Sequence, residues 1–316
     1  MRAKSREKRR ASTGPAGGPS GDTTIAFWLV AFLDMLGYRA TLRKFDVYPL
    51  PTEPGEQDAF RKRFVHAVHL RRRLLGAIRE FQASTRRETP LPADLPPQAR
   101  PTAERWRKAK LLNMPGPDHV VLACSLTGDV DHFPLRGVYN TVATACAAIL
   151  IQLALGADDH EQSLPLRGGI DIAPGALLHP EDFLYSPALT RAYDLESKAA
   201  VYPRTLAGDR FLGYLRAHSE DRGPDPTTRY NGALADRVLS MFFRDHDGKT
   251  ALDFLGASFR ENLPDELACS LATKAWQFVR RGQAAAKGGG DQRVVAKYDW
   301  LVNYVEPRVE LWGVRP

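Results

Sequence analysis

Continuous apolar runs alternate with polar, periodic segments along the chain, and together they predict its strands and helices. Residues 24–33 (TIAFWLVAFL) are apolar throughout and rich in β-branched and aromatic side chains, which is typical of a strand buried on both faces. Residues 142–156 form the longest apolar run, but Thr144 and Gln152 interrupt it and it falls short of the ~20 residues of a membrane span. We therefore expect a helix buried inside the protein there, and no membrane-spanning segment.

The remaining pattern predicts further elements of both kinds. Phe60, Phe64 and Val68 begin a helical repeat that continues to Ile78, and five prolines in residues 84–101 indicate a surface loop after it. A Pro-Gly turn between two short apolar runs predicts a β-hairpin. The predicted elements are, in chain order, strand 24–33, a helix over 60–78, hairpin strands 109–112 and 119–124, helix 135–155, strands 166–173, 176–178 and 183–185, helix 187–198 and a strand that begins within 201–205.

This order predicts an α+β fold, because strands follow one another directly and do not alternate strictly with helices. We expect a central antiparallel sheet with helices on one side, and the first run and residues 166–173 as its central strands. Further along, the sequence predicts a hairpin over 244–254 that turns at Asp247-Gly248, and a helix over 264–281 that ends before Gly282. The predicted units are a disordered basic tail (1–22), a core domain (23–207) with a Pro-rich loop at 84–104, and an extension (208–316) that packs on the core or continues it.

Composition and charge narrow the class of protein. The chain has 316 residues, a formal net charge of +7 and three widely spaced cysteines. The cysteine spacing excludes a disulfide scaffold and a zinc ribbon, and it suits a cytoplasmic protein. The first ten residues hold six of the Lys and Arg residues, so the remaining chain is nearly balanced and we expect no specific nucleic-acid binding by a folded face. The tail either solubilises the protein or contacts RNA, DNA or anionic lipid.

Two aspartates stand where predicted strands end. Asp34 follows the first apolar run and precedes a Gly-containing turn, and Asp118 lies at the tip of the predicted hairpin. If these strands are neighbours, the two carboxylates lie close together and can hold a pair of divalent cations that clamps a triphosphate. Either aspartate alone is more often a turn former or a helix cap, so the interpretation rests on their combination. The backbone N–H groups that would point at the phosphate oxygens are those of Leu36, Gly37 and Tyr38.

Five segments carry motifs in a characteristic order: AFLDMLGYRATL (31–42), PGPDHVVLACSL (115–126), PLRGGIDIA (165–173), LYSPALTRAYDLESKAAVYPR (184–204) and KYDWL (297–301). Together they resemble the class III nucleotide cyclase family, and within it the bacterial pyrimidine cyclases of Pycsar antiphage defence. The resemblance covers roughly residues 24–205 and the late KYDWL fragment. It implies a cyclase-type central antiparallel sheet flanked by helices.

The resemblance also implies a site and a reaction. Asp34 and Asp118 match the metal-binding aspartates of the family, and the carbonyl of Met35 matches its backbone ligand, for two Mn²⁺ or Mg²⁺ ions. The implied enzyme is a lyase that converts UTP, or with less support CTP, to the 3′,5′-cyclic monophosphate and pyrophosphate. It would work as a homodimer, and its product would be a second messenger in antiviral defence for a separate effector protein that forms no stable complex with it.

The sequence departs from the family pattern at two places. Thr190 and Asp194 occupy the positions of the family's Asn and Arg, so Arg191 and Arg204 become candidates for the missing cation. Before the hairpin, Asn113 stands where the family has a purine-reading residue, which favours a pyrimidine or a degenerate site, although Asn113 also suits a turn. The alternatives are an adenylyl or guanylyl cyclase and a catalytically inactive nucleotide-binding sensor.

Overall fold

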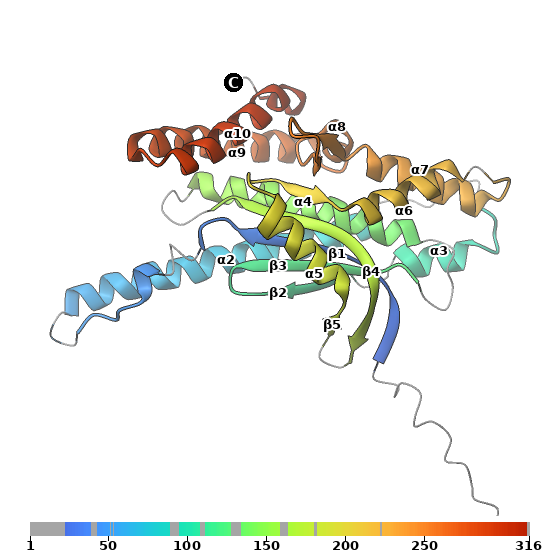
Figure 1. Cartoon of the computed structure of the whole chain (residues 1–316), viewed down its shortest axis with the longest axis horizontal. Coiled ribbons are helices and arrows are strands. Elements are labelled where there is room, and N and C mark those ends of the chain that lie inside the picture. Colours follow the sequence, from blue (N-terminus) through green and yellow to red (C-terminus); the bar gives the residue numbers. More distant parts are fainter. Residues whose placement is uncertain are drawn as a thin grey trace, which may run out of the picture.

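One mixed β-sheet organises the molecule (Figure 1). The computed structural model describes residues 23–38, 43–50, 52, 54–88, 95–107, 111–127, 134–158, 164–179, 182–221 and 223–314. In these ranges the sheet has eight strands in the order β2-β3-β1-β4-β6-β8-β7, with β5 paired to β4. The strands are β1 (Thr23–Met35), β2 (Leu112–Pro115), β3 (His119–Ser125), β4 (Leu166–Leu178), β5 (Phe183–Tyr185), β6 (Thr205–Ala207), β7 (Phe242–Arg244) and β8 (Thr250–Leu252). The predicted tail (1–22) lies outside the described residues.

The two long strands β1 and β4 lie at the centre of the sheet, as the apolar runs predict. Each is an antiparallel partner of the other over its whole length, and β3 pairs with the opposite edge of β1. The expected antiparallel sheet is wrong at one pair, because β6 runs parallel to β4. The chain can make this parallel connection because α5 and the turn after it carry it back across the sheet.

Helices cover both faces of the sheet, which corrects the expectation of helices on one side. The α-helices of the described residues are α2 (Pro54–Glu88), α3 (Arg100–Arg107), α4 (Pro134–Asp158), α5 (Pro187–Asp194), α6 (Asp209–Glu220), α7 (Pro226–Leu239), α8 (Ala257–Arg260), α9 (Asp265–Gly289) and α10 (Gln292–Val309). The side chains of β1 alternate between the faces: Leu29 and Leu33 pack under α2 and α4, whereas Val30 and Phe32 share a second cluster with α5. At Gly169 a Cβ atom would lie 2.2 Å from the carbonyl oxygen of Ala192, so only glycine lets α5 approach β4 this closely.

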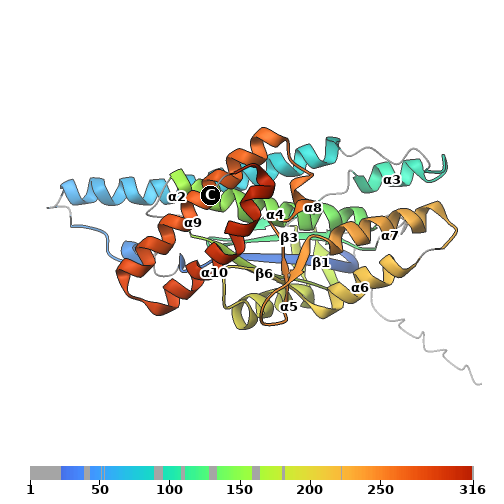
Figure 2. The same ribbon diagram turned by 90° about the horizontal axis from the view of Figure 1, so that it is seen from above.

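The longest apolar run forms α4, the central helix of the molecule, as predicted. Its length and hydropathy would suffice to cross a membrane, but 89% of its most apolar window is buried inside the protein. Figures 1 and 2 show α9 and α10 lying over α4, so that α4 is covered on the side away from the sheet. The apolar character of α4 therefore reflects packing between two layers of the protein.

Several predicted boundaries are wrong. The first hairpin strand lies at Leu112–Pro115 and not at 109–112. The strands predicted at 166–173 and 176–178 are one continuous strand, β4, because its pairing with β1 runs on through Pro174 and Gly175. The predicted loop at 84–104 is helical at both ends, because its first proline is Pro90, so α2 runs to Glu88, and Pro101 fits the first turn of α3. The strand predicted within 201–205 begins only at Thr205. Helix α9 continues past Gly282, because the ring of Tyr298 on α10 occupies the space where a Cβ atom would stand.

The region after residue 208 continues the same sheet. The predicted hairpin exists as β7 and β8, and β8 pairs with β6. Helix α9 packs along α4, and α10 packs on α9. The segment 297–301 lies on α10.

Candidate active site at the end of β1

Asp34 stands at the end of β1 between two residues of the neighbouring strands. In the strand register it lies opposite His119 of β3 on one side and Arg167 of β4 on the other. The next residue, Met35, donates its backbone N–H to the carbonyl of Asp118 at 2.9 Å. The structure therefore brings the two predicted aspartates to the same end of neighbouring strands.

Negative charge accumulates around Asp34. Burial, followed by the negative charges of Glu196 and Asp118, raises the pKa of Asp34 from 3.8 to about 7, and Arg167 opposes this shift. The Asp34 carboxyl is hydrogen-bonded to that of Glu196. Two carboxyl groups that share a hydrogen bond titrate as a pair, and the pair loses its last proton at a higher pH than an isolated carboxyl group does.

Glu196 is a residue of this site that the sequence analysis did not identify. It lies in a π-helical turn, Leu195–Ala199, directly after α5, and it is 2% exposed. Arg167 forms an ion pair with it, while burial raises its pKa. A signal was present in the sequence, because Glu196 follows the buried Ala188 and Ala192 at intervals of four residues.

Arg71 of α2 fixes the tip of the β2–β3 hairpin. Its Nη2 atom donates to the carbonyl oxygens of Gly116, at 2.9 Å, and His119. Burial lowers the pKa of Arg71, and the negative charge of Asp118 opposes this. Its Nε and Nη1 atoms are buried without a hydrogen-bond partner in the part of the chain that the structure describes. Arg71 therefore brings positive charge to the side of the site nearest α2.

His119 connects the hairpin tip to α5. Its Nδ1 lies 2.9 Å from the carboxylate of Asp118, and its ring stacks on Phe32 with centroids 5.0 Å apart. Phe32 also contacts Tyr193 of α5, whose ring meets it edge-on with the centroids 5.6 Å apart. These contacts hold Asp118 near the face of the sheet that α5 covers.

The turn after Asp34 offers fewer donors than the sequence predicts. The N–H of Leu36 donates to the carbonyl of Pro165 at 3.0 Å, so it is not available to a phosphate oxygen. Gly37 has φ +89°, a conformation that favours glycine, and Tyr38 is the first helical residue after it. The N–H groups of Gly37 and Tyr38 remain the candidates, since a helix leaves its first N–H groups without internal partners.

Asn113 lies on the other face of the sheet. It pairs with Leu122, which packs in the cluster under α2 and α4, whereas its neighbours Leu112 and Met114 belong to the cluster on the α5 side. The structure therefore does not bring Asn113 to the face where Asp34 lies. Both polar atoms of its side chain are nevertheless buried without a hydrogen-bond partner among the described residues.

None of the α5 residues that the resemblance points to, Thr190, Arg191 and Asp194, places a free cation beside Asp34. Thr190 is exposed, and Asp194 lies 2.9 Å from Lys198. Arg191 donates from Nη1 to the carbonyl of Ile172 at 3.1 Å. Neither the threonine nor this engaged arginine replaces the family's arginine at that position.

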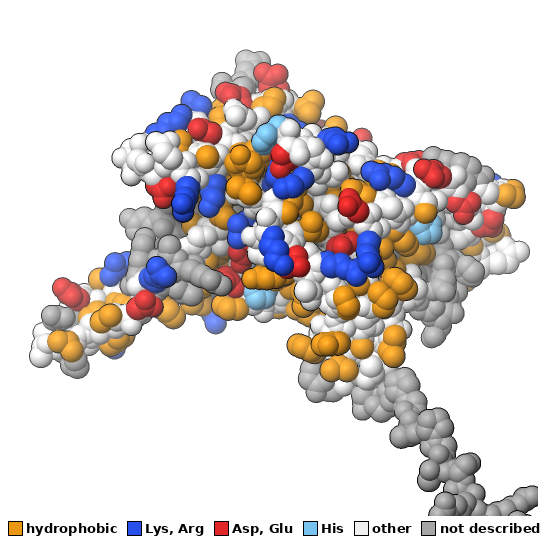
Figure 3. Space-filling model, viewed as in Figure 1, with side chains coloured by type: hydrophobic (Ala, Val, Ile, Leu, Met, Phe, Trp, Pro, Cys, Tyr) orange, Lys and Arg blue, Asp and Glu red, His pale blue; other side chains and the backbone are white. Residues whose placement is uncertain are grey.

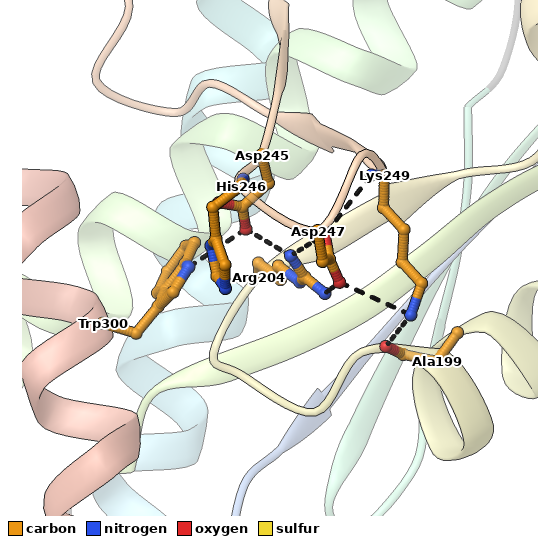
Figure 4. Close-up of polar contacts among 7 residues, drawn as sticks. All are labelled: Ala199, Arg204, Asp245, His246, Asp247, Lys249 and Trp300. Carbon is orange, nitrogen blue, oxygen red and sulfur yellow. Dashed lines mark hydrogen bonds and ion pairs between the residues drawn. The ribbon is translucent and has the colours of Figure 1, made fainter.

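Arg204 belongs to a different cluster (Figure 4). It is 1% exposed, and it donates to the carboxylates of Asp245 and Asp247 in the turn of the β7–β8 hairpin. The hydrogen bonds from Arg204 hold the pKa of Asp247 well below its ordinary value. Because two carboxylates neutralise Arg204, it is unsuited to act as the missing cation.

Lys297 is a cation near this site. The sequence analysis named it only as part of the KYDWL segment. It lies on α10, and burial together with the positive charge of Arg167 lowers its pKa. The negative charge of Asp291 opposes this shift. Lys297 is thus a partly buried ammonium group close to the arginine that borders Asp34.

Carboxylate oxygens are the ligands that Mg²⁺ and Mn²⁺ prefer, and close carboxylates of this kind fit a divalent cation. Within the described ranges, however, no three His, Cys, Asp or Glu side chains already converge as a metal centre. Asp34, Asp118 and the carbonyl of Met35 would need to be completed by water or substrate oxygens. A scan against protein-family models and searches of the curated proteins and of the solved structures found no match for this chain.

Proposed function

We propose that this protein is a nucleotide cyclase that converts a pyrimidine nucleoside triphosphate, UTP before CTP, to its 3′,5′-cyclic monophosphate and pyrophosphate. The single observation that carries the proposal is the group of carboxylates around Asp34, in which burial and like charge raise the pKa to about 7. Such repulsion is relieved when a cation binds, so the apo site favours divalent metal. The preference for a pyrimidine rests on the sequence resemblance alone.

The residues of the chain have separable roles in this proposal. Asp34, Asp118 and the Met35 carbonyl would hold two Mn²⁺ or Mg²⁺ ions, which supply charge neutralisation of the triphosphate and a more acidic ribose hydroxyl. Arg71 keeps the hairpin tip, and with it Asp118, in place. Lys297 would bind a phosphate oxygen, because a phosphate anion would offset the positive charge of Arg167 that acts on this lysine.

A homodimer is part of the proposal, and an exposed apolar surface supports it. Figure 3 shows hydrophobic side chains gathered at the lower end of the molecule, where β1 begins, β4 ends and β5 pairs with β4. Exposed apolar side chains gathered in one place mark interaction sites in soluble proteins. The exposed residues of these strands, with fractional exposures between 38% and 73%, are Ile25, Phe27, Leu178, Phe183 and Tyr185.

The dimer is tested by replacing Phe183 and Tyr185 together with serine. Both side chains are exposed, so the substitution opens no cavity and the melting temperature should stay nearly unchanged. We expect wild-type protein at twice the chain mass of 35.1 kDa in light scattering, and the variant at the single chain mass with lowered activity. A wild-type monomer with full activity would refute the dimer.

The reaction is tested by incubating purified protein with each of the four nucleoside triphosphates and Mn²⁺, followed by mass spectrometry of the products. The proposal predicts cyclic UMP as the main product and cyclic CMP as the lesser one. Product from ATP or GTP alone would identify a purine cyclase instead.

A catalytically inactive nucleotide-binding sensor is the second candidate, and the paired Asp194 favours it. The cation of the family is replaced by an acid that Lys198 already neutralises. Titration of UTP with Mn²⁺ separates the candidates, because a sensor binds the nucleotide and releases it unchanged.

A further inference from the structure

A cavity of about 560 Å³ opens between the β7–β8 hairpin and α10, apart from the carboxylates around Asp34. Its size is in the range of small-molecule sites and suits a ligand as large as a nucleoside. Its lining includes Tyr202, His246, Asp299, Trp300, Asn303 and Arg308.

The aromatic wall of the cavity is held rigidly. Trp300 stacks almost parallel with Tyr202 (centroids 6.1 Å apart) and with Tyr304 (5.3 Å). The indole Nε1 of Trp300 donates to Asp245 at 3.0 Å, and this carboxylate also accepts from Arg204 (Figure 4). The rings therefore cannot rotate to fill the cavity, and they offer a preformed apolar surface to a flat ligand.

Hydrogen-bonding groups of α10 and of the β7–β8 hairpin stand beside this wall. Asp299 accepts from Gln283 at 2.6 Å and lies 3.6 Å from Lys287, which leaves further carboxylate lone pairs for a ligand. Asn303 is exposed on α10 and offers an amide that both donates and accepts. His246 uses Nδ1 toward Asp245 at 2.8 Å, which leaves its Nε2.

We propose that this cavity binds a nucleoside whose base carries an exocyclic amino group. The flat ring would lie against the wall of Tyr202 and Trp300, the amino group would donate to Asp299, and the ring edge would pair with Asn303. Arg308 lines the cavity, but it is already paired with Asp253 at 2.8 Å and donates to the carbonyl of Tyr304, so it is not free to hold a phosphate group and the proposed ligand is a nucleoside. The proposal stands independently of the cyclase reaction.

Binding has a physical consequence for the hairpin. His246 belongs to the turn in which Asp247 binds Arg204 and Lys249 donates to the carbonyl of Ala199 at 3.2 Å (Figure 4). A ligand that contacts His246 and α10 together joins the hairpin to the helix layer. We therefore expect the bound protein to melt at a higher temperature, as any ligand of the native state achieves.

The test is isothermal titration of the full chain, in EDTA, with cytidine, adenosine, guanosine, uridine and inorganic phosphate. We expect binding of at least one of the three amino-bearing nucleosides, at least tenfold weaker binding of uridine, and no binding of phosphate. Asp299→Ala and Asn303→Ala should each weaken the best nucleoside by about tenfold. The melting temperature of free Asn303→Ala should stay unchanged, because Asn303 is exposed, and that of free Asp299→Ala should fall slightly, because the hydrogen bond from Gln283 is lost. Asp34→Asn is the matched control and should bind like wild type.

Three results would overturn the proposal. Absence of nucleoside binding, or equal affinity for uridine, would remove the base-reading role of Asp299. Loss of binding in Asp34→Asn would move the ligand to the site at the end of β1. Unchanged affinity in both Asp299→Ala and Asn303→Ala would show that the cavity is not where the nucleoside binds.

Discussion

The protein contains two clusters in which arginine meets carboxylates, and their electrostatics are opposite. At the end of β1, Arg167 pairs with Glu196, and Asp34 and Asp118 add two further carboxyl groups beside this pair. The pKa of Asp34 rises there to about 7. In the β7–β8 turn, Arg204 donates to both Asp245 and Asp247, and the pKa of Asp247 falls below its ordinary value.

The difference lies in the balance of charge and hydrogen bonds. Each acid in the hairpin cluster has donors: Asp245 accepts from Arg204 and Trp300, and Asp247 from Arg204 and the backbone of Lys249. Around Asp34 the carboxylates outnumber the paired cation. A satisfied cluster fixes structure, whereas an unsatisfied cluster is ready for a ligand of opposite charge.

The largest effect is expected from breaking the satisfied cluster. Arg204→Met removes the main hydrogen-bond donor of two partly buried carboxylates, Asp245 and Asp247. We therefore expect a loss of about 3–5 kcal/mol in the free energy of unfolding. Urea denaturation at neutral pH measures it. Arg191→Met, which removes a single hydrogen bond to a carbonyl, serves as the control and should cost about 1 kcal/mol. Equal losses in the two variants would contradict the structural role of Arg204.

Divalent cation should stabilise the unsatisfied cluster and leave the other unaffected. Mn²⁺ at 100 times its dissociation constant should raise the free energy of unfolding by about 2.7 kcal/mol, because it binds the native state only. Melting curves in EDTA and in Mn²⁺ measure this, with Asp34→Asn as the variant that should lose the effect. A stabilisation that persists in Asp34→Asn would place the cation elsewhere.

Removing one carboxylate should relieve the repulsion at the end of β1. The folded state raises the pKa of Asp34 above its ordinary 3.8, so folding retains a proton that the unfolded chain loses. This unfavourable contribution is absent below pH 4, grows as the pH rises toward 7, and is complete above it. In EDTA, Asp34→Asn should therefore be more stable than wild type by about 1–3 kcal/mol at pH 8 and nearly equal to it at pH 4. Urea denaturation at the two pH values checks it, and a variant that is less stable at pH 8 would contradict the raised pKa.

The smallest expected effect concerns the contact between the two clusters. Lys249 is 44% exposed, lies 3.5 Å from Asp247 and donates to the carbonyl of Ala199 at the end of the turn that carries Glu196. Lys249→Ala should cost about 0.5–1 kcal/mol, which thermal melting resolves against wild type. A loss as large as that of Arg204→Met would mean that the exposed lysine, and not the buried arginine, holds the hairpin.

Local patterns predicted the central part of the fold. The apolar run of residues 24–33 predicts a strand buried on both faces, and residues 28–33 are buried in this way in the central strand, with Asp34 after them. Ile25 and Phe27, at the start of the run, are exposed. The hairpin followed from its Pro-Gly turn, which placed Asp118 at the tip. Both aspartates were therefore found from positions at strand ends, without knowledge of the partner strands.

The remaining features depend on contacts between distant segments. The partners of Arg204 come 41 and 43 residues later, so no local pattern shows that its charge is neutralised. Helix α9 continues past Gly282, and the glycine is required there because the ring of Tyr298 on α10 occupies the space that a Cβ atom would need. The spacing of Glu196 after Ala188 and Ala192 was visible in the sequence, but the ion pair that holds Glu196 in the site comes from Arg167 on another element.

The central claim is that the acids at the end of β1 serve chemistry and those in the β7–β8 turn serve structure. The most direct test measures the rate at which wild type and Asp118→Ala form cyclic nucleotide from UTP in the presence of Mn²⁺, together with the melting temperature of each protein. Asp118 is at a hairpin tip and partly exposed, so its truncation opens no cavity. The account predicts at least a ~10³-fold loss of product, as expected when one preorganised charged group worth ~4 kcal/mol is removed, at an unchanged or higher melting temperature. An Asp118→Ala variant that keeps more than about a tenth of the activity at normal stability, or that unfolds, would contradict it.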